Sequence, residues 1–136
     1  MMANFDAPGR EECIANRIIS NTPQQALTLL NDPTFVEASR VFASNLLSGK
    51  PCSEEERVTA AYERALCRVP KAKETQSLLE FLKQQRDYYT PHPDEAEKLL
   101  KVGFAPQPSN IAAPELAAWT QVCRVILNLH ETITRY

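Results

Sequence analysis

The sequence contains little glycine, no close pair of cysteines and no long apolar run. Only three of its 136 residues are glycine, which disfavours folds that depend on tight hairpins or on glycine-rich phosphate loops. The four cysteines are scattered at Cys13, Cys52, Cys67 and Cys123, without any C-x-x-C spacing. That spacing is typical of zinc sites and of attached c-type haem. We therefore expect no metal and no cofactor.

A surplus of positive charge is missing as well. The chain carries 15 basic and 17 acidic residues, for a net charge of −2 at pH 7. Proteins that bind nucleic acid through phosphate contacts usually show a basic surplus or stripe, so we expect no nucleic-acid partner. No apolar run approaches the roughly 18–20 residues of a membrane span, and the first residues lack the pattern of a signal peptide. The residues alone leave the compartment open.

Prolines and capping residues divide the chain into helices. Thr22 and Ser53 each open a capping box, with a glutamine or a glutamate three residues later. Asp32 precedes Pro33 and is a good cap for a second helix. These signals, together with apolar residues at helical spacing, predict helices that follow Thr22, Asp32 and Ser53 and helices over about 72–89, 94–102 and 114–135.

The predicted fold class is all-α, a compact bundle of about five to six helices with an irregular N-terminal arm. Residues 1–136 form one domain, in which 1–21 are the arm and 22–136 the bundle. The last helix is apolar around most of its circumference and includes Trp119, so we expect it to lie at the centre. In the second helix, we expect an apolar stripe along Phe35, Ala38, Phe42 and Leu46, widened by Val36, Ala43 and Leu47.

No catalytic motif is present, and we predict no catalytic residue. The two histidines, His92 and His130, are isolated in the sequence. A basic group formed by Arg64, Arg68 and Lys71 follows the third helix. It has two interpretations, which are favourable charge near a helix C-terminus and an anion-binding site.

A second polar set surrounds the first helix and comprises Asp6, Arg17, Asn21, Asn31 and Asp32. Capping explains Asp32, but it leaves the other four without a role. The structural interpretation is a buried pair of Arg17 with Asp6 that ties the arm to the bundle. The alternative is a ligand-binding cluster.

Several stretches of the sequence also carry a family resemblance. They are 5–8, 21–27, 30–33, 65–70, 115–120 and 127–131. With them the chain resembles the C-terminal part of a planctomycete-specific domain of unknown function. That domain occurs in large planctomycete and verrucomicrobial proteins that often also carry a c-type cytochrome domain. Two positions depart from the pattern, since Cys67 stands where glycine is usual and His130 where aspartate is usual.

The resemblance implies that the chain is the tail of a longer, exported protein, periplasmic or at the cell surface, with any haem-binding motif in a separate upstream domain. It implies no established activity. We predict a helical packing or interaction module that is non-catalytic by itself, whose partners are the upstream domains or a second copy. The alternative is one lobe of a redox or carbohydrate-directed active site that upstream domains complete.

Overall fold

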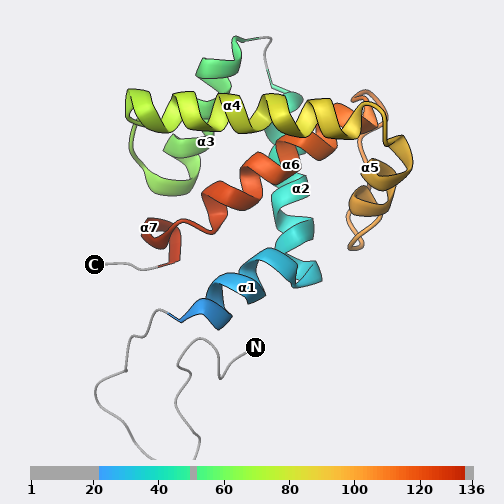
Figure 1. The fold of residues 1–136 in the computed structure, drawn as a ribbon, viewed down its shortest axis with the longest axis horizontal. Helices are drawn as coiled ribbons and strands as arrows, with labels where there is room; N and C mark the ends of the chain where they lie inside the picture. Colours follow the sequence, from blue (N-terminus) through green and yellow to red (C-terminus); the bar gives the residue numbers. More distant parts are fainter. Residues whose placement is uncertain (1–21, 50–51, 134–136) are drawn as a thin grey trace, which may run out of the picture.

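The computed structural model of the chain describes residues 22–49 and 52–133, and these contain helices and no strand (Figure 1). This confirms the all-α prediction. The predicted arm, 1–21, lies outside the described residues. The helices are α1 (Pro23–Asn31), α2 (Pro33–Leu47), α3 (Glu54–Leu66), α4 (Ala72–Tyr89), α5 (Pro93–Leu100), α6 (Ala113–Leu127) and α7 (His130–Ile133).

The helices begin where the capping signals predict. The Thr22 hydroxyl accepts a hydrogen bond from the Gln25 backbone at 3.4 Å, and the Gln25 side chain accepts one from the Thr22 backbone at 3.2 Å. Ser53 forms the same reciprocal pair with Glu56, at 3.2 and 2.9 Å. The Asp32 carboxylate accepts from the backbone of Thr34 at 2.9 Å. Side chains thus satisfy N–H groups that the first helical turn leaves without intrahelical partners.

The ends of the helices differ more from the prediction. The last helix was expected to reach about residue 135, but α6 ends at Leu127 and the short α7 follows. The Thr132 hydroxyl donates to the Ile126 carbonyl at 2.8 Å, which gives that carbonyl a partner near the end of α6. The third helix ends at Leu66, before Pro70, and Cys67 at its end adopts a left-handed conformation with φ 54°.

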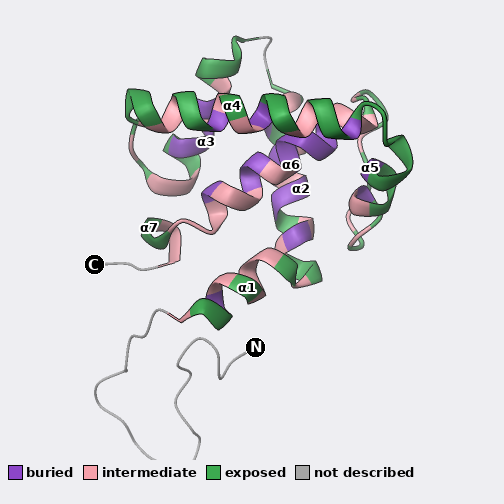
Figure 2. Ribbon diagram, viewed as in Figure 1, coloured by how far each residue is buried: buried purple, intermediate pink, exposed green. Residues whose placement is uncertain are grey.

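The central position of α6 is confirmed. It packs against α2, α4 and α5 and also contacts α1, α3 and α7. Eight of its fifteen residues are buried (Figure 2), and Trp119 is 0% exposed. Burial of this helix by several neighbours explains why apolar residues cover so much of its circumference. None of the helices within 22–49 and 52–133 is long and apolar enough to cross a membrane.

The stripe predicted for α2 is only partly right. Val36, Ala43 and Leu46 are buried as expected, but Ala38 is exposed. The buried positions also include the polar residues Ser39 and Arg40. Arg40 is 1% exposed. A buried guanidinium group needs hydrogen-bond acceptors, and those of Arg40 come from a loop that lies far along the chain.

Candidate functional site

Two side chains of α2 hold the segment between α5 and α6. Arg40 donates hydrogen bonds from Nη2 to the Ala105 carbonyl at 2.7 Å and from Nη1 to the Pro106 carbonyl at 3.3 Å. Glu37 Oε1 accepts from the backbone N–H of Phe104 at 2.7 Å and also from that of Ala105. Glu37 therefore binds two backbone N–H groups of this short stretch, and Arg40 binds two of its carbonyls. We call residues 103–106 the clamped loop.

A glycine is required where the clamped loop begins. Gly103 has φ +92°, and a Cβ atom placed there would lie 2.3 Å from Cδ of Glu37. A larger residue would be strained in this backbone conformation and would also push the Glu37 carboxylate away. The close approach of Gly103 thus allows Glu37 to reach the two N–H groups that follow.

The clamped loop presents an aromatic ring to solvent. Phe104 is 100% exposed, more than any other large hydrophobic residue among the described residues. Because Glu37 and Arg40 hold the backbone on both sides of the ring, an incoming surface would meet a pre-organised anchor. Exposed aromatic side chains on ordered backbone are typical of the residues that contribute most to protein–protein binding.

A groove of about 580 Å³ lies between α3 and α4. Apolar atoms of Thr59 on α3 and of Ala72, Thr75 and Leu79 on α4 contribute to its lining. Leu79 also packs against the hydrophobic core, so the floor of the groove is continuous with the folded interior. Charged residues that line it are Glu55, Glu80 and Lys83.

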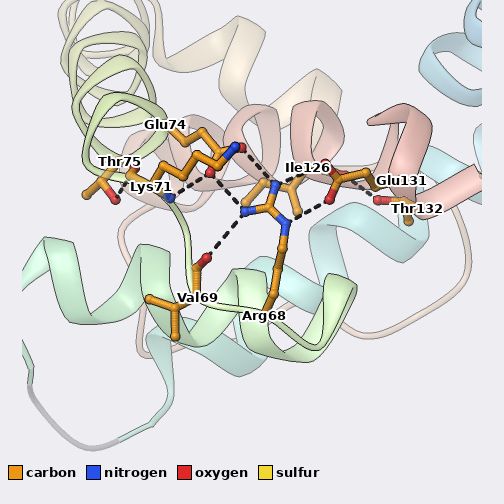
Figure 3. A network of polar contacts seen from close by, with 8 residues as sticks. All are labelled: Arg68, Val69, Lys71, Glu74, Thr75, Ile126, Glu131 and Thr132. Carbon is orange, nitrogen blue, oxygen red and sulfur yellow. Dashed lines mark hydrogen bonds and ion pairs between the residues drawn. The ribbon is translucent and has the colours of Figure 1, made fainter.

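At the turn between α3 and α4, Arg68 forms a network of ion pairs (Figure 3). Its guanidinium group donates to both oxygens of Glu74, at 2.8 and 2.9 Å, and to both oxygens of Glu131 on α7, at 2.7 and 3.2 Å. The backbone of Lys71 donates to Glu74 at 2.6 Å. These bonds tie α3, α4 and α7 together, and the hydrogen bonds from Arg68 and Lys71 lower the pKa of Glu74 to about 2.

The ion pairs of Arg68 affect how the predicted anion-binding set of Arg64, Arg68 and Lys71 could bind an anion. Arg64 is exposed on α3, Lys71 precedes α4, and Arg68 lies between two carboxylates. An anion that approached Arg68 would compete with Glu74 and Glu131 for the same donors. Anion binding by this set stays a prediction.

A second ion-pair network joins α3, α4 and α6. Arg86 donates to both oxygens of Glu115, at 2.8 and 2.6 Å, and to Glu54 at 2.5 Å. The indole N–H of Trp119 also donates to Glu115, at 3.0 Å. Burial by itself raises the pKa of Glu115, but the hydrogen bonds from Arg86 and Trp119 hold it below its ordinary value. The network positions the first turn of the central helix.

The polar set around the first helix is only partly visible. Asp6, Arg17 and Asn21 lie outside the described residues. The Asn31 side chain donates to the Leu27 carbonyl at 3.0 Å, and Asp32 caps α2. Asn31 and Asp32 are neighbours with local backbone partners, and a ligand-binding role for the set stays a prediction.

The remaining reactive side chains are dispersed. His92 stacks on Tyr88 with ring centroids 5.0 Å apart, and Nδ1 of His92 lies 2.8 Å from the Tyr88 carbonyl. Burial raises the pKa of the Cys123 thiol, whereas Cys52 and Cys67 are exposed free thiols. Across 22–49 and 52–133, no three His, Cys, Asp or Glu side chains are grouped so that they could hold a metal ion.

Sequence reasoning missed the residues that build the clamped loop and the Arg86 network. Glu37, Arg40, Arg86 and Glu115 have the ordinary appearance of charged helix residues, because their partners lie far away in the sequence. The sequence does contain one indication that Phe104 could be a functional residue. It is an aromatic residue directly after glycine in a proline-containing loop.

The chain matches the model of a known family over part of its length. Residues 1–82 match PSD1, which is described as a protein of unknown function (DUF1553). The matched region covers more than half of the chain. Comparisons with curated proteins and with solved structures found no match.

Proposed function

The chain belongs to the PSD1 family of proteins of unknown function (DUF1553), and from that premise we propose that it is a non-catalytic packing and interaction module of a larger exported protein. The wider setting proposed here is that of large planctomycete and verrucomicrobial proteins that often also carry a c-type cytochrome domain. In that setting the module binds another polypeptide, either an upstream domain of its parent protein or a second copy of itself.

The observation that carries this proposal is the clamped loop. Arg40 is 1% exposed, and its guanidinium group donates to two loop carbonyls. Burying such a group is costly unless its donors are paired. Nη1 and Nη2 are paired with the loop carbonyls and so fix the backbone around Phe104, whereas the buried Nε has no partner among the described residues. While it is exposed to water, the Phe104 ring contributes no free energy of burial to the isolated domain. It contributes to binding once a partner covers it.

The ion-pair networks support a structural role for the charged residues. Arg68 and Arg86 each bind two carboxylates from different parts of the chain. In both networks the charges join helices, as expected for a domain whose polar groups position its elements. The partly exposed pairs are individually weak, but a guanidinium group shared by two carboxylates also fixes geometry.

The experiment measures association of the purified chain with the polypeptide encoded upstream in its reading frame, and with itself, by isothermal titration and by sedimentation. Phe104→Ser should weaken the association at least tenfold, since truncation of a central anchor costs about 2 kcal/mol or more. Val69→Ser is the matched control, because Val69 is another exposed apolar residue, located at the α3–α4 turn.

Two results would count against the proposal. Association that is equally strong in wild type and in Phe104→Ser would show that the clamped loop is not the contact. Turnover of a substrate by the isolated chain would instead favour the alternative, in which this domain forms one lobe of an active site.

A further inference from the structure

We propose that Arg124 on α6 binds a carboxylate of residues 1–21, and that Arg124 and Asn128 together form the surface to which this segment docks. Residues 1–21 are the predicted arm, which precedes α1 in the sequence and lies outside the described residues. The inference goes beyond the proposed function and does not depend on the clamped loop.

Two buried polar atoms at the end of α6 have no hydrogen-bond partner among the described residues. They are Nε of Arg124, which is a donor, and Oδ1 of Asn128, which is an acceptor. Residues four positions apart on a helix lie on the same face, and buried polar groups are rarely left unpaired. Their partner must supply an acceptor and a donor together. A polypeptide supplies both, whereas a small anion such as sulfate supplies acceptors alone.

The charge of Arg124 has no counter-ion among the described residues. Nη1 donates to the side-chain oxygen of Gln121 at 2.8 Å, and Nη2 donates to the Leu30 carbonyl. Both of these acceptors are uncharged. Burial lowers the pKa of Arg124, and only the neighbouring Tyr89 acts against it. Arg86 shows the opposite behaviour, because its hydrogen bonds to carboxylates raise its pKa.

The elements that surround Arg124 do not offer a free carboxylate. No residue of α1, whose carbonyl Arg124 binds, carries a charge. Asp32 follows α1, but its carboxylate caps α2 through the backbone of Thr34. Glu131 follows α6, but it binds Arg68. Neither carboxylate contributes to the pKa of Arg124. The missing counter-ion must therefore come from outside the described residues.

Residues 1–21 carry suitable groups and are attached close by. The segment has a net charge of −1, from three carboxylates and two guanidinium groups, which are Asp6, Glu11, Glu12, Arg10 and Arg17. If Asp6 pairs with Arg17, as the sequence predicts, Glu11 and Glu12 remain for Arg124. A carboxylate side chain supplies the acceptor that Arg124 needs, and a backbone N–H of the same segment supplies the donor for Asn128.

The length of the segment also allows this contact. It ends directly before α1, which packs against α6 (Figure 1). Arg124 binds near the far end of α1, about 13 Å from its start. An extended chain covers about 3.3 Å per residue, so about four residues are enough to return along α1. All three carboxylates lie at least 10 positions before Thr22 and can reach Arg124. Covalent attachment favours them over a separate partner, because it raises their effective concentration.

Limited trypsin digestion of the purified chain tests the contact, with cleavage after Arg17 as the measurement. The arm-neutral variant combines Asp6→Asn, Glu11→Gln and Glu12→Gln and leaves the residues next to Arg17 unchanged. This variant and Arg124→Met should each be cleaved there roughly five- to tenfold faster than wild type, since a hydrogen bond between charged groups no longer holds the segment. Combining the two should give no further increase, because both remove the same contact.

Lys73→Met is the matched control, because it removes an exposed positive charge from α4. It should be cleaved after Arg17 like wild type, and the arm-neutral changes should still accelerate cleavage when they are added to it. The three carboxylate substitutions made singly identify the partner of Arg124. Circular dichroism checks that each variant is folded. Arg124→Gln, which removes the charge but keeps a donor, replaces Arg124→Met if that variant does not fold.

Two results would overturn the inference. The first is cleavage of the arm-neutral variant at the wild-type rate. The second is an acceleration by the arm-neutral changes that is as large in Arg124→Met as in wild type, which would mean that the carboxylates act elsewhere. Neither result would affect the proposed function, whose test is the loss of association in Phe104→Ser.

Discussion

Replacing Cys67 by glycine should stabilise the domain. Cys67 ends α3 with φ 54° and ψ 30°, the one non-glycine residue with a positive φ in the described chain. A residue with a Cβ atom loses about 1–2 kcal/mol in the left-handed conformation. Glycine avoids that loss, but it gains about 0.4–1 kcal/mol of conformational entropy in the unfolded chain. The difference leaves Cys67→Gly more stable by roughly 0.5–1 kcal/mol.

Cys67→Ala is the matched control for this substitution. Alanine also removes the exposed thiol, but it keeps the Cβ atom and therefore the conformational strain. Its free energy of unfolding should stay close to that of wild type. Urea unfolding followed by circular dichroism under reducing conditions measures all three proteins, and the expected gain for glycine corresponds to a rise of roughly 2–4 °C in Tm.

The comparison between glycine and alanine decides the outcome. If Cys67→Gly is no more stable than Cys67→Ala, then the left-handed conformation costs nothing at this position and the reasoning is refuted. A gain would also explain physically why glycine is usual at this position in the pattern that the sequence resembles, since glycine is the common residue where a helix ends in the left-handed region.

Three further predictions concern the core, acid stability and bound groups. Trp119→Ala should lower the free energy of unfolding by about 3–5 kcal/mol, because Trp119 is 0% exposed; a loss under 1 kcal/mol in urea titration would contradict its place in the core. The pKa of Glu74 is lowered to about 2 beside Arg68, so its stabilising effect is present above about pH 4.5 and is lost as pH falls toward 2. The free energy of unfolding of wild type should therefore fall more steeply over that range than that of Glu74→Gln. A parallel pH dependence in the two proteins would refute the lowered pKa of Glu74. The purified chain should show no Soret absorption and no stoichiometric metal by elemental analysis, and one tightly held zinc per chain would overturn this.

Local chemistry explains why much of the fold could be predicted. A helix start depends on residues within one turn of each other, so Thr22, Asp32 and Ser53 specify the beginnings of α1, α2 and α3 by themselves. The breadth of the apolar surface on α6 similarly predicts that several neighbours bury it, although not which ones.

Contacts between residues far apart in sequence arise only when the helices pack together. Arg40 and Ala105 are 65 positions apart, and Arg86 and Glu115 are 29 apart. Within its own helix, each charged residue has the pattern of a solvent-exposed position, and nothing local distinguishes it from its neighbours.

The same limit applies to the candidate site. A loop near residue 104 could be predicted from local residues, because glycine and proline interrupt the helical pattern there. Whether Phe104 would turn inward or outward depended on where that loop meets α2. Glu37 and Arg40 hold its backbone so that the ring remains in water, and their position relative to the loop arises only when α2, α5 and α6 pack together.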